Sequence, residues 1–217
     1  MKDIQSLIGY SFKSKELLDK ALTHTSYSHI HGGENYQRLE FLGDSIVDFL
    51  VAEELCKAYP QVDEGKLTKM RGAVVSATPL AQVVKERGYD SHIKLGFGDL
   101  SDKIRSDVFE ALCAAIYLDG GIQEARKFVV KDLADLIKAA EVNCKNDYKS
   151  MLYEAYAGHD IKFKDNGKKG EEHRPVFMVE LYIDGQLAAS GEGESKKSAQ
   201  KECAREVLEK QSFLKRI

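Results

Sequence analysis

The apolar and polar positions between residues 37 and 55 predict the helix around which the chain is organised. The segment Gln37–Leu55 has no proline and is rich in leucine, isoleucine, valine and glutamate, and its single glycine, Gly43, is one that a helix tolerates. At about 100° per residue, one side collects the polar residues Gln37, Glu40, Asp44 and Asp48. The other side is apolar and is expected to face the core, with Leu39, Leu42, Ile46, Phe49 and Leu50.

A second acidic pair lies within an otherwise apolar segment. Asp107 and Glu110 are spaced i, i+3 in SDVFEALCAAIYLDGG. A row of acids on one helix is commonly just a solvated face. Carboxylates among apolar neighbours are costly to bury, however, unless a positive charge meets them. The two acidic sets together therefore favour a divalent cation held between two helices.

The rest of the first part of the chain shows helical periodicity. Ser14 is a candidate N-cap, and Thr23 to Tyr27 is expected to end the helix that it starts. HIHGGEN and the segment from Tyr89 to Asp102 are expected to be loops. Further helices are predicted near residues 4–8 and over 15–24, 63–76, 77–88, 103–118 and 121–141.

The period of the pattern changes after Asn143 to Asp147. A helix is predicted over Tyr148–Ala157, and another begins at Ser195. Between them, alternating residues predict three strands, with Asp184-Gly185 as a hairpin turn: Ile161–Lys164, Pro175–Ile183 and Gln186–Glu192. The sequence therefore predicts two domains, an all-α domain over 1–143 and an α+β (α-β-β-β-α) module over 148–217, joined by a linker at 144–147.

Composition and charge narrow the function. The chain has 43% hydrophobic and 31% charged residues, which is typical of a globular protein. Without an apolar run of about 18 residues or a signal peptide, we expect no membrane association and a cytoplasmic location. The net charge of −3 excludes a uniformly basic nucleic-acid binder, so attraction to a polyanion must come from local clusters.

The histidines and cysteines add no second site. His24, His29 and His31 lie close in sequence, but they lack the fixed spacing or nearby acid of a ligand set. The four cysteines are scattered without CxxC spacing, which indicates neither a zinc site nor a disulfide framework.

Several motifs, in order, resemble bacterial ribonuclease III. They are ALTHTSY, RLEFLGDS, GKLTKMR and SDVFEALCAAIYLDGG, and the tail resembles the family's double-stranded RNA-binding domain. The resemblance implies an all-helical endonuclease domain that forms a homodimer. It implies Mg²⁺, with Mn²⁺ as a substitute, bound by Glu40, Asp44, Asp107 and Glu110.

The implied reaction is hydrolysis of double-stranded RNA, as in rRNA and mRNA processing. It leaves 5′-phosphate and 3′-hydroxyl ends with short 3′ overhangs. Asp44 and Glu110 are expected to be closest to the chemistry, and one or two ions fit the site. Phe41 resembles the family's aromatic residue that enters a pocket of the partner subunit. Glu64 resembles a further acid of the family that lies near the RNA. Gln37 departs from the family's glutamate and removes one negative charge.

The resemblance also assigns residues that contact RNA in the second domain. Lys196 and Lys197, in the first turn of the last helix, are expected to bind phosphates, with Lys201 beside a Gln200 that replaces the usual third lysine. In that family the first helix and a Gly-Pro-x-His loop reach the minor groove. This implies roles for Glu154 and His173, although Glu171 replaces the loop proline.

Two alternatives remain beside the endonuclease. One is a catalytically inactive RNA-binding relative, which Gln37 leaves open and the four acids disfavour. The other is a helical metal-dependent phosphohydrolase with an unrelated RNA-binding tail, which is disfavoured because such sites typically rely on several histidines and none accompanies the acids.

Overall fold

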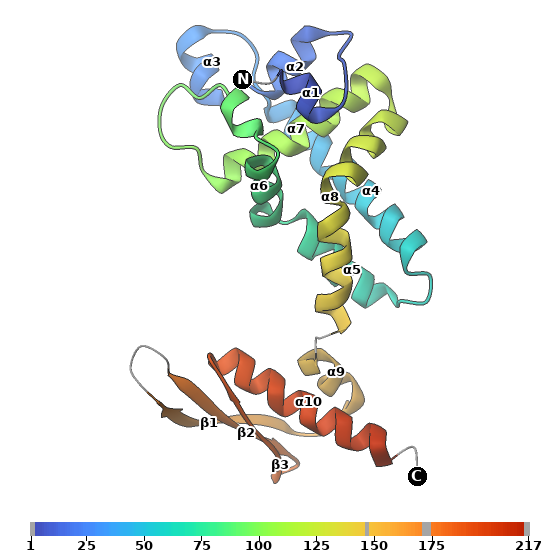
Figure 1. Cartoon of the computed structure of the whole chain (residues 1–217), viewed down its shortest axis with the longest axis vertical. Helices are drawn as coiled ribbons and strands as arrows, with labels where there is room; N and C mark the ends of the chain where they lie inside the picture. Colours follow the sequence, from blue (N-terminus) through green and yellow to red (C-terminus); the bar gives the residue numbers. More distant parts are fainter. Residues whose placement is uncertain (1–2, 146–147, 171–174, 215–217) are drawn as a thin grey trace. The chain divides into compact units, whose positions relative to one another are not determined.

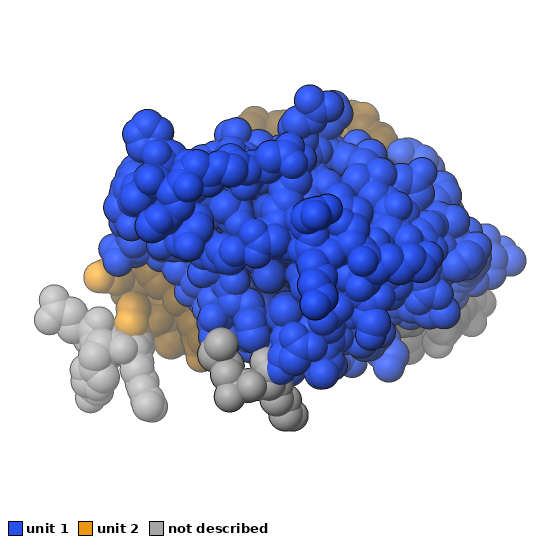
Figure 2. All heavy atoms as spheres, turned by 90° about the horizontal axis from the view of Figure 1, so that it is seen from above, with its two compact units in different colours: residues 1–144 blue, residues 145–217 orange. Residues whose placement is uncertain are grey.

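The chain forms two compact units, residues Met1–Cys144 and Lys145–Ile217, coloured separately in Figure 2. The computed structural model describes residues 3–145, 148–170 and 175–214 (Figure 1). The linker predicted at 144–147 overlaps the end of a helix that runs to Lys145, and residues 146 and 147 lie outside the described part. Within the described residues, no helix has the length and apolar character needed to cross a membrane.

The first unit is helical over its described residues, as the sequence predicted. Side-chain oxygens of Ser14, Asp63 and Ser101 accept backbone N–H groups at the starts of three helices, which fixes where those helices begin. The elements are α1 (Ile4–Ile8), α2 (Lys15–Ala21), α3 (Thr25–His31), α4 (Gln37–Ala58), α5 (Glu64–Val75), α6 (Ala77–Glu86), the 3₁₀ turn η1 (Tyr89–His92), α7 (Asp102–Gly120) and α8 (Ile122–Lys145).

Two segments expected to be loops contain helical turns. His24 accepts the backbone N–H of Ser26 through Nδ1 at 3.1 Å, and this cap starts α3 where the preceding helix was predicted to end. Tyr89 at the start of η1 is fully buried and donates its hydroxyl to Asp132 of α8 at 2.6 Å. A local cap and one tertiary hydrogen bond therefore order residues whose sequence pattern is weak.

Helices α4 and α7 cross with their backbones in contact. A Cβ added to Gly43 would lie 1.9 Å from the carbonyl oxygen of Glu110. The helix tolerates Gly43, as predicted, and the crossing also requires it, because only a residue without a side chain fits there. The expectation that Phe49 faces the core was wrong, since its side chain is 55% exposed.

The second unit has the predicted α-β-β-β-α order. Its elements are α9 (Tyr148–Ala155), β1 (Ile161–Lys169), β2 (Val176–Ile183), β3 (Gln186–Gly193) and α10 (Lys196–Leu214). The strands form one antiparallel sheet in the order β1-β2-β3. Asp184 and Gly185 both have positive φ, 51° and 77°, as a tight hairpin turn requires. Leu152, Leu181 and Cys203 join α9, the sheet and α10 in one small core.

We predict that Gly43→Ala lowers the free energy of unfolding by roughly 1–3 kcal/mol, because the added methyl group overpacks a backbone contact. Urea unfolding measures the loss. Gly72→Ala is the matched control: it lies inside α5, and no atom stands within 4 Å of its Cβ position. The control should keep or gain stability, by up to about 1 kcal/mol. Equal stabilities for the two variants would contradict a backbone contact at Gly43.

Candidate active site and RNA-binding surface

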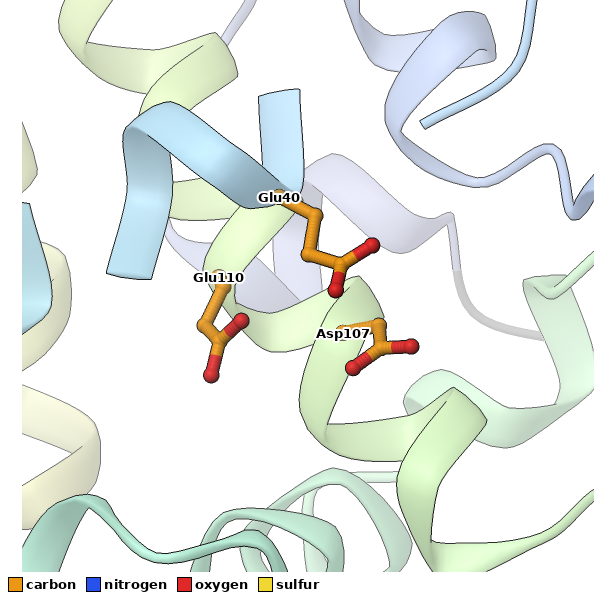
Figure 3. Close-up of side chains that lie close together, drawn as sticks. All are labelled: Glu40, Asp107 and Glu110. Atoms are coloured by element: carbon orange, nitrogen blue, oxygen red, sulfur yellow. The ribbon is translucent and has the colours of Figure 1, made fainter. Parts of the chain in front are cut away.

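Three carboxylates from α4 and α7 come together at the helix crossing. Glu40, Asp107 and Glu110 each offer one oxygen, and these oxygens lie within 4.8 Å of one another. Figure 3 shows Glu40 descending from α4 toward Asp107 and Glu110, which both project from α7. The sequence predicted this meeting of acids from two separate helices.

The backbone explains why these acids converge. Asp107 and Glu110 are one turn apart on α7 and so share a face, and Glu40 lies one turn before Gly43 on α4. The close approach at Gly43 brings the two faces together. Asp107 is buried, whereas Glu40 and Glu110 are half-buried. The cluster is therefore rigidly backed on one side and reachable from solvent on the other.

Asp44, the fourth predicted ligand, borders this cluster. It is exposed on α4, four residues after Glu40, and is not one of the three acids that meet within 4.8 Å. Its negative charge nevertheless raises the pKa of Glu110, with an effect second only to burial. Asp44 is therefore close enough to Glu110 for its charge to affect the same side of the site.

Burial and the neighbouring acids both act on Glu110. Burial, followed by the charges of Asp44 and Asp107, raises the pKa of Glu110 to about 8. The neutral form is therefore favoured near pH 7 when no cation is present, and a bound cation would favour the ionised form instead. Carboxylate oxygens alone form a donor set suited to a hard cation such as Mg²⁺. The residues at this site fit that ion.

Two residues that the sequence analysis missed complete the site. Lys103 donates to Asp107 Oδ1 at 2.5 Å and to Glu40 Oε1 at 3.2 Å. The hydroxyl of buried Tyr36 lies 3.5 Å from Asp107 Oδ2, and burial, followed by the charge of Asp107, raises the pKa of Tyr36 above its usual range. The i, i+4 spacing of Lys103 and Asp107 was a usable signal. Contact between Tyr36 and Asp107 depends on the tertiary fold.

Three further polar positions named in the sequence analysis, two of them acidic, lie outside the cluster. Asp48 is near Arg71, with 3.8 Å between carboxylate and guanidinium, and Glu64 accepts the Thr68 hydroxyl in the first turn of α5 at 3.0 Å. Gln37 is exposed at the start of α4. None of these three is among the acids that meet at the crossing.

The predicted RNA contacts of the second unit lie on its helices. Lys196 and Lys197 are exposed in the first turn of α10, and Glu154 is exposed on α9. Lys196 forms an ion pair with Asp165 of β1, and Lys201 Nζ stands 6.0 Å from the centre of the Tyr148 ring. His173 lies outside the described residues.

One further contact joins the two helices of the second unit. Gln200, which replaces the expected lysine, accepts a hydrogen bond from Lys149 Nζ through its Oε1 at 2.8 Å. Lys149 is on α9 and Gln200 on α10, so the substituted residue links the helices that carry the predicted RNA contacts.

The predicted dimer contact is a solvent-exposed aromatic side chain. Phe41 is 82% exposed on α4, between the acidic positions Glu40 and Asp44. A single exposed phenylalanine is common on protein surfaces, but Phe49 on the same helix is exposed as well. The side chain of Phe41 therefore takes no part in the core of the single chain.

Comparison with known proteins connects both units to one family. A family model described as ribonuclease-III-like matches residues 14–137, and the double-stranded RNA binding motif matches residues 148–211. Ribonuclease 3 of Symbiobacterium thermophilum is 37% identical, over 93% of this chain and 90% of that protein. Ribonuclease 3 of Pseudothermotoga lettingae is 36% identical, over 96% of this chain and 94% of that protein.

Solved structures agree with these sequence relatives. The nuclease domain of ribonuclease III from Campylobacter jejuni has a TM-score of 0.56 and 30% identity, covering 61% of this chain and 94% of that one. Dicer from Pichia stipitis has a TM-score of 0.51 and 28% identity, covering 91% and 94%. The family-model match over more than half of the chain and the near full-length relatives lead to one conclusion: this chain belongs to the ribonuclease III family.

Proposed function

We propose that the chain is a Mg²⁺-dependent endoribonuclease that cleaves double-stranded RNA to 5′-phosphate and 3′-hydroxyl ends with short 3′ overhangs, in rRNA and mRNA processing in the cytoplasm. The observation that carries the proposal is the meeting of Glu40, Asp107 and Glu110 at one helix crossing. Its location in a chain that also has the RNA-binding motif supports an RNA substrate.

Each acid has a distinct part in this proposal. Asp107 and Glu40 would hold the ion, with Asp107 fixed by burial, and Glu110 would add a ligand in its ionised form. Asp44 stands at the open edge, where it can orient water or complete the ligand set. Bound Mg²⁺ would supply a water of lowered pKa and offset charge on the phosphate. No histidine or lysine is then needed as a general base.

The second unit would hold the duplex by its shape. Lys196 and Lys197 lie where the free N–H groups and dipole of α10 add to their charge, a setting suited to phosphate oxygens. Glu154 on α9, Lys201 on α10 and His173 complete the proposed contacts. Recognition across grooves of A-form RNA does not depend on base sequence, so binding should depend strongly on salt.

A homodimer would place two such sites on one duplex. One site cuts one strand, and a two-fold pair cuts both strands. Phe41, which is 82% exposed, is the proposed dimer contact. The Campylobacter jejuni nuclease domain, to which this chain is similar, has a region involved in dimer formation, and this supports the proposal.

We predict that Glu110→Gln slows cleavage of a long RNA duplex by at least about 100-fold, because it removes a ligand charge and keeps the side-chain volume. Gel assays with and without Mg²⁺ measure the rate, and a binding assay should give an affinity close to that of the wild type. Glu16→Gln, at an exposed position in α2, is the control and should cleave normally. Wild-type protein that binds duplex and never cuts it would instead support the inactive relative.

We predict that Lys196→Ala/Lys197→Ala weakens duplex binding and reduces the slope of log affinity against log salt by about one to two, since up to two phosphate contacts are lost. Lys162→Ala/Lys164→Ala is the matched control. These lysines alternate with Ile161 and Phe163, which pack on the core, and so lie on the opposite face of the sheet from the helices. An unchanged slope would remove Lys196 and Lys197 from the interface.

We predict that Phe41→Ala shifts the chain toward monomer, because it removes a large apolar side chain from the proposed interface. Sedimentation equilibrium measures the dimer dissociation constant, which should rise by at least about ten-fold. Phe97→Ala is the control, since Phe97 is exposed to a similar degree, 64%, on a loop. If both variants associate like the wild type, Phe41 has no part in the dimer.

A further inference from the structure

A lysine occupies the space between two of the clustered acids. Lys103 is the second residue of α7, and its ammonium bridges Asp107 on its own helix and Glu40 on α4. Among the described side chains, these are the contacts that neutralise charge in the cluster directly. Glu110, the third acid, forms no ion pair with a described residue, although the charge of Lys103 lowers its pKa.

The helix dipole does not explain this lysine. A cation in the first turn of a helix opposes the helix dipole, which favours acids there. The side chain of Lys103 is 69% exposed, although its ammonium contacts the carboxylates of Glu40 and Asp107. Such a side chain is flexible and can leave its site without disturbing the core.

We propose that Lys103 is a positioning residue that holds Glu40 and Asp107 together before a metal arrives and then competes with the divalent cation for the same oxygens. This inference rests on the proposed function. A divalent ion entering the cluster must displace the ammonium or share Glu40 and Asp107 with it. Lys103 thereby preserves the arrangement of the site and weakens its affinity for the ion.

The free energy lost when the metal displaces the Lys103 ammonium sets how much this lysine weakens metal binding. The Lys103 side of these ion pairs is largely exposed, and a pair screened by solvent contributes up to about 1 kcal/mol, so its loss on metal binding corresponds to roughly five-fold in affinity. The competition is electrostatic and Lys103 is largely exposed, so a higher salt concentration should reduce the influence of Lys103 on metal affinity.

Titration of the full-length protein with Mn²⁺ alone, in a calorimeter and without RNA, tests the proposal. Lys103→Met removes the charge and keeps the length of the side chain, and it should bind Mn²⁺ about five-fold more tightly than the wild type at low salt. Lys103→Arg keeps a cation in place and should bind like the wild type. The difference between Lys103→Met and the wild type should shrink when KCl is raised.

Lys85→Met is the matched control. Lys85 pairs with Asp102 at the start of the same helix, with 3.2 Å between Nζ and Oδ1, and does not contact the cluster. The Lys85→Met variant should bind Mn²⁺ with the same affinity as the wild type. Unchanged or weaker Mn²⁺ binding by Lys103→Met would overturn the proposal.

A second readout uses stability. Mn²⁺ should raise the melting temperature of Lys103→Met more than it raises that of the wild type, since tighter binding stabilises the folded state more. An equal rise in both would also overturn the role of Lys103. Absence of Mn²⁺ binding in wild type and variant alike would overturn the metal site and, with it, the proposed function.

Discussion

The contact between the backbones of α4 and α7 is the constraint on which the first unit depends. Gly43 allows this contact, because any side chain there would overlap the carbonyl group of Glu110. The same crossing sets the separation between the acids of one helix and those of the other. Stability and the candidate active site therefore rely on one feature of the packing.

Charge repulsion is the cost of that arrangement. Carboxylates brought together at the edge of an apolar core repel one another, and burial, followed by the charges of Asp44 and Asp107, raises the pKa of Glu110. The protein relieves the repulsion partly with Lys103, which bridges Glu40 and Asp107, and partly with the Tyr36 hydroxyl near Asp107. The remaining negative charge would favour binding of a divalent cation. Strain of this kind is typical of functional sites rather than of structural ion pairs.

The second unit also depends on close approach at glycines, here between a strand and a helix. Gly191 and Gly193 of β3 lie against the start of α10, where added Cβ atoms would stand 2.5 Å from the Ala199 carbonyl oxygen and 2.2 Å from the Ser198 hydroxyl. The close packing fixes the first turn of α10, which carries Lys196 and Lys197, against the sheet. Asp165 of β1 pairs with Lys196 in the free protein, so RNA phosphates would have to replace that carboxylate.

The sequence by itself determined the order of most elements, the two-part organisation and the acids that meet. Periodicity and caps are local properties, and Asp107 and Glu110 stood out because their neighbours are apolar. Tertiary structure alone decided that Gly43 is required, that Phe49 is exposed and that Tyr89 of η1 is buried against α8. It also decided that Lys103 and Tyr36 face Asp107, while Asp44 borders the cluster. These features depend on which helix faces come into contact across long stretches of sequence, and a pattern along one segment carries no information about its distant neighbours.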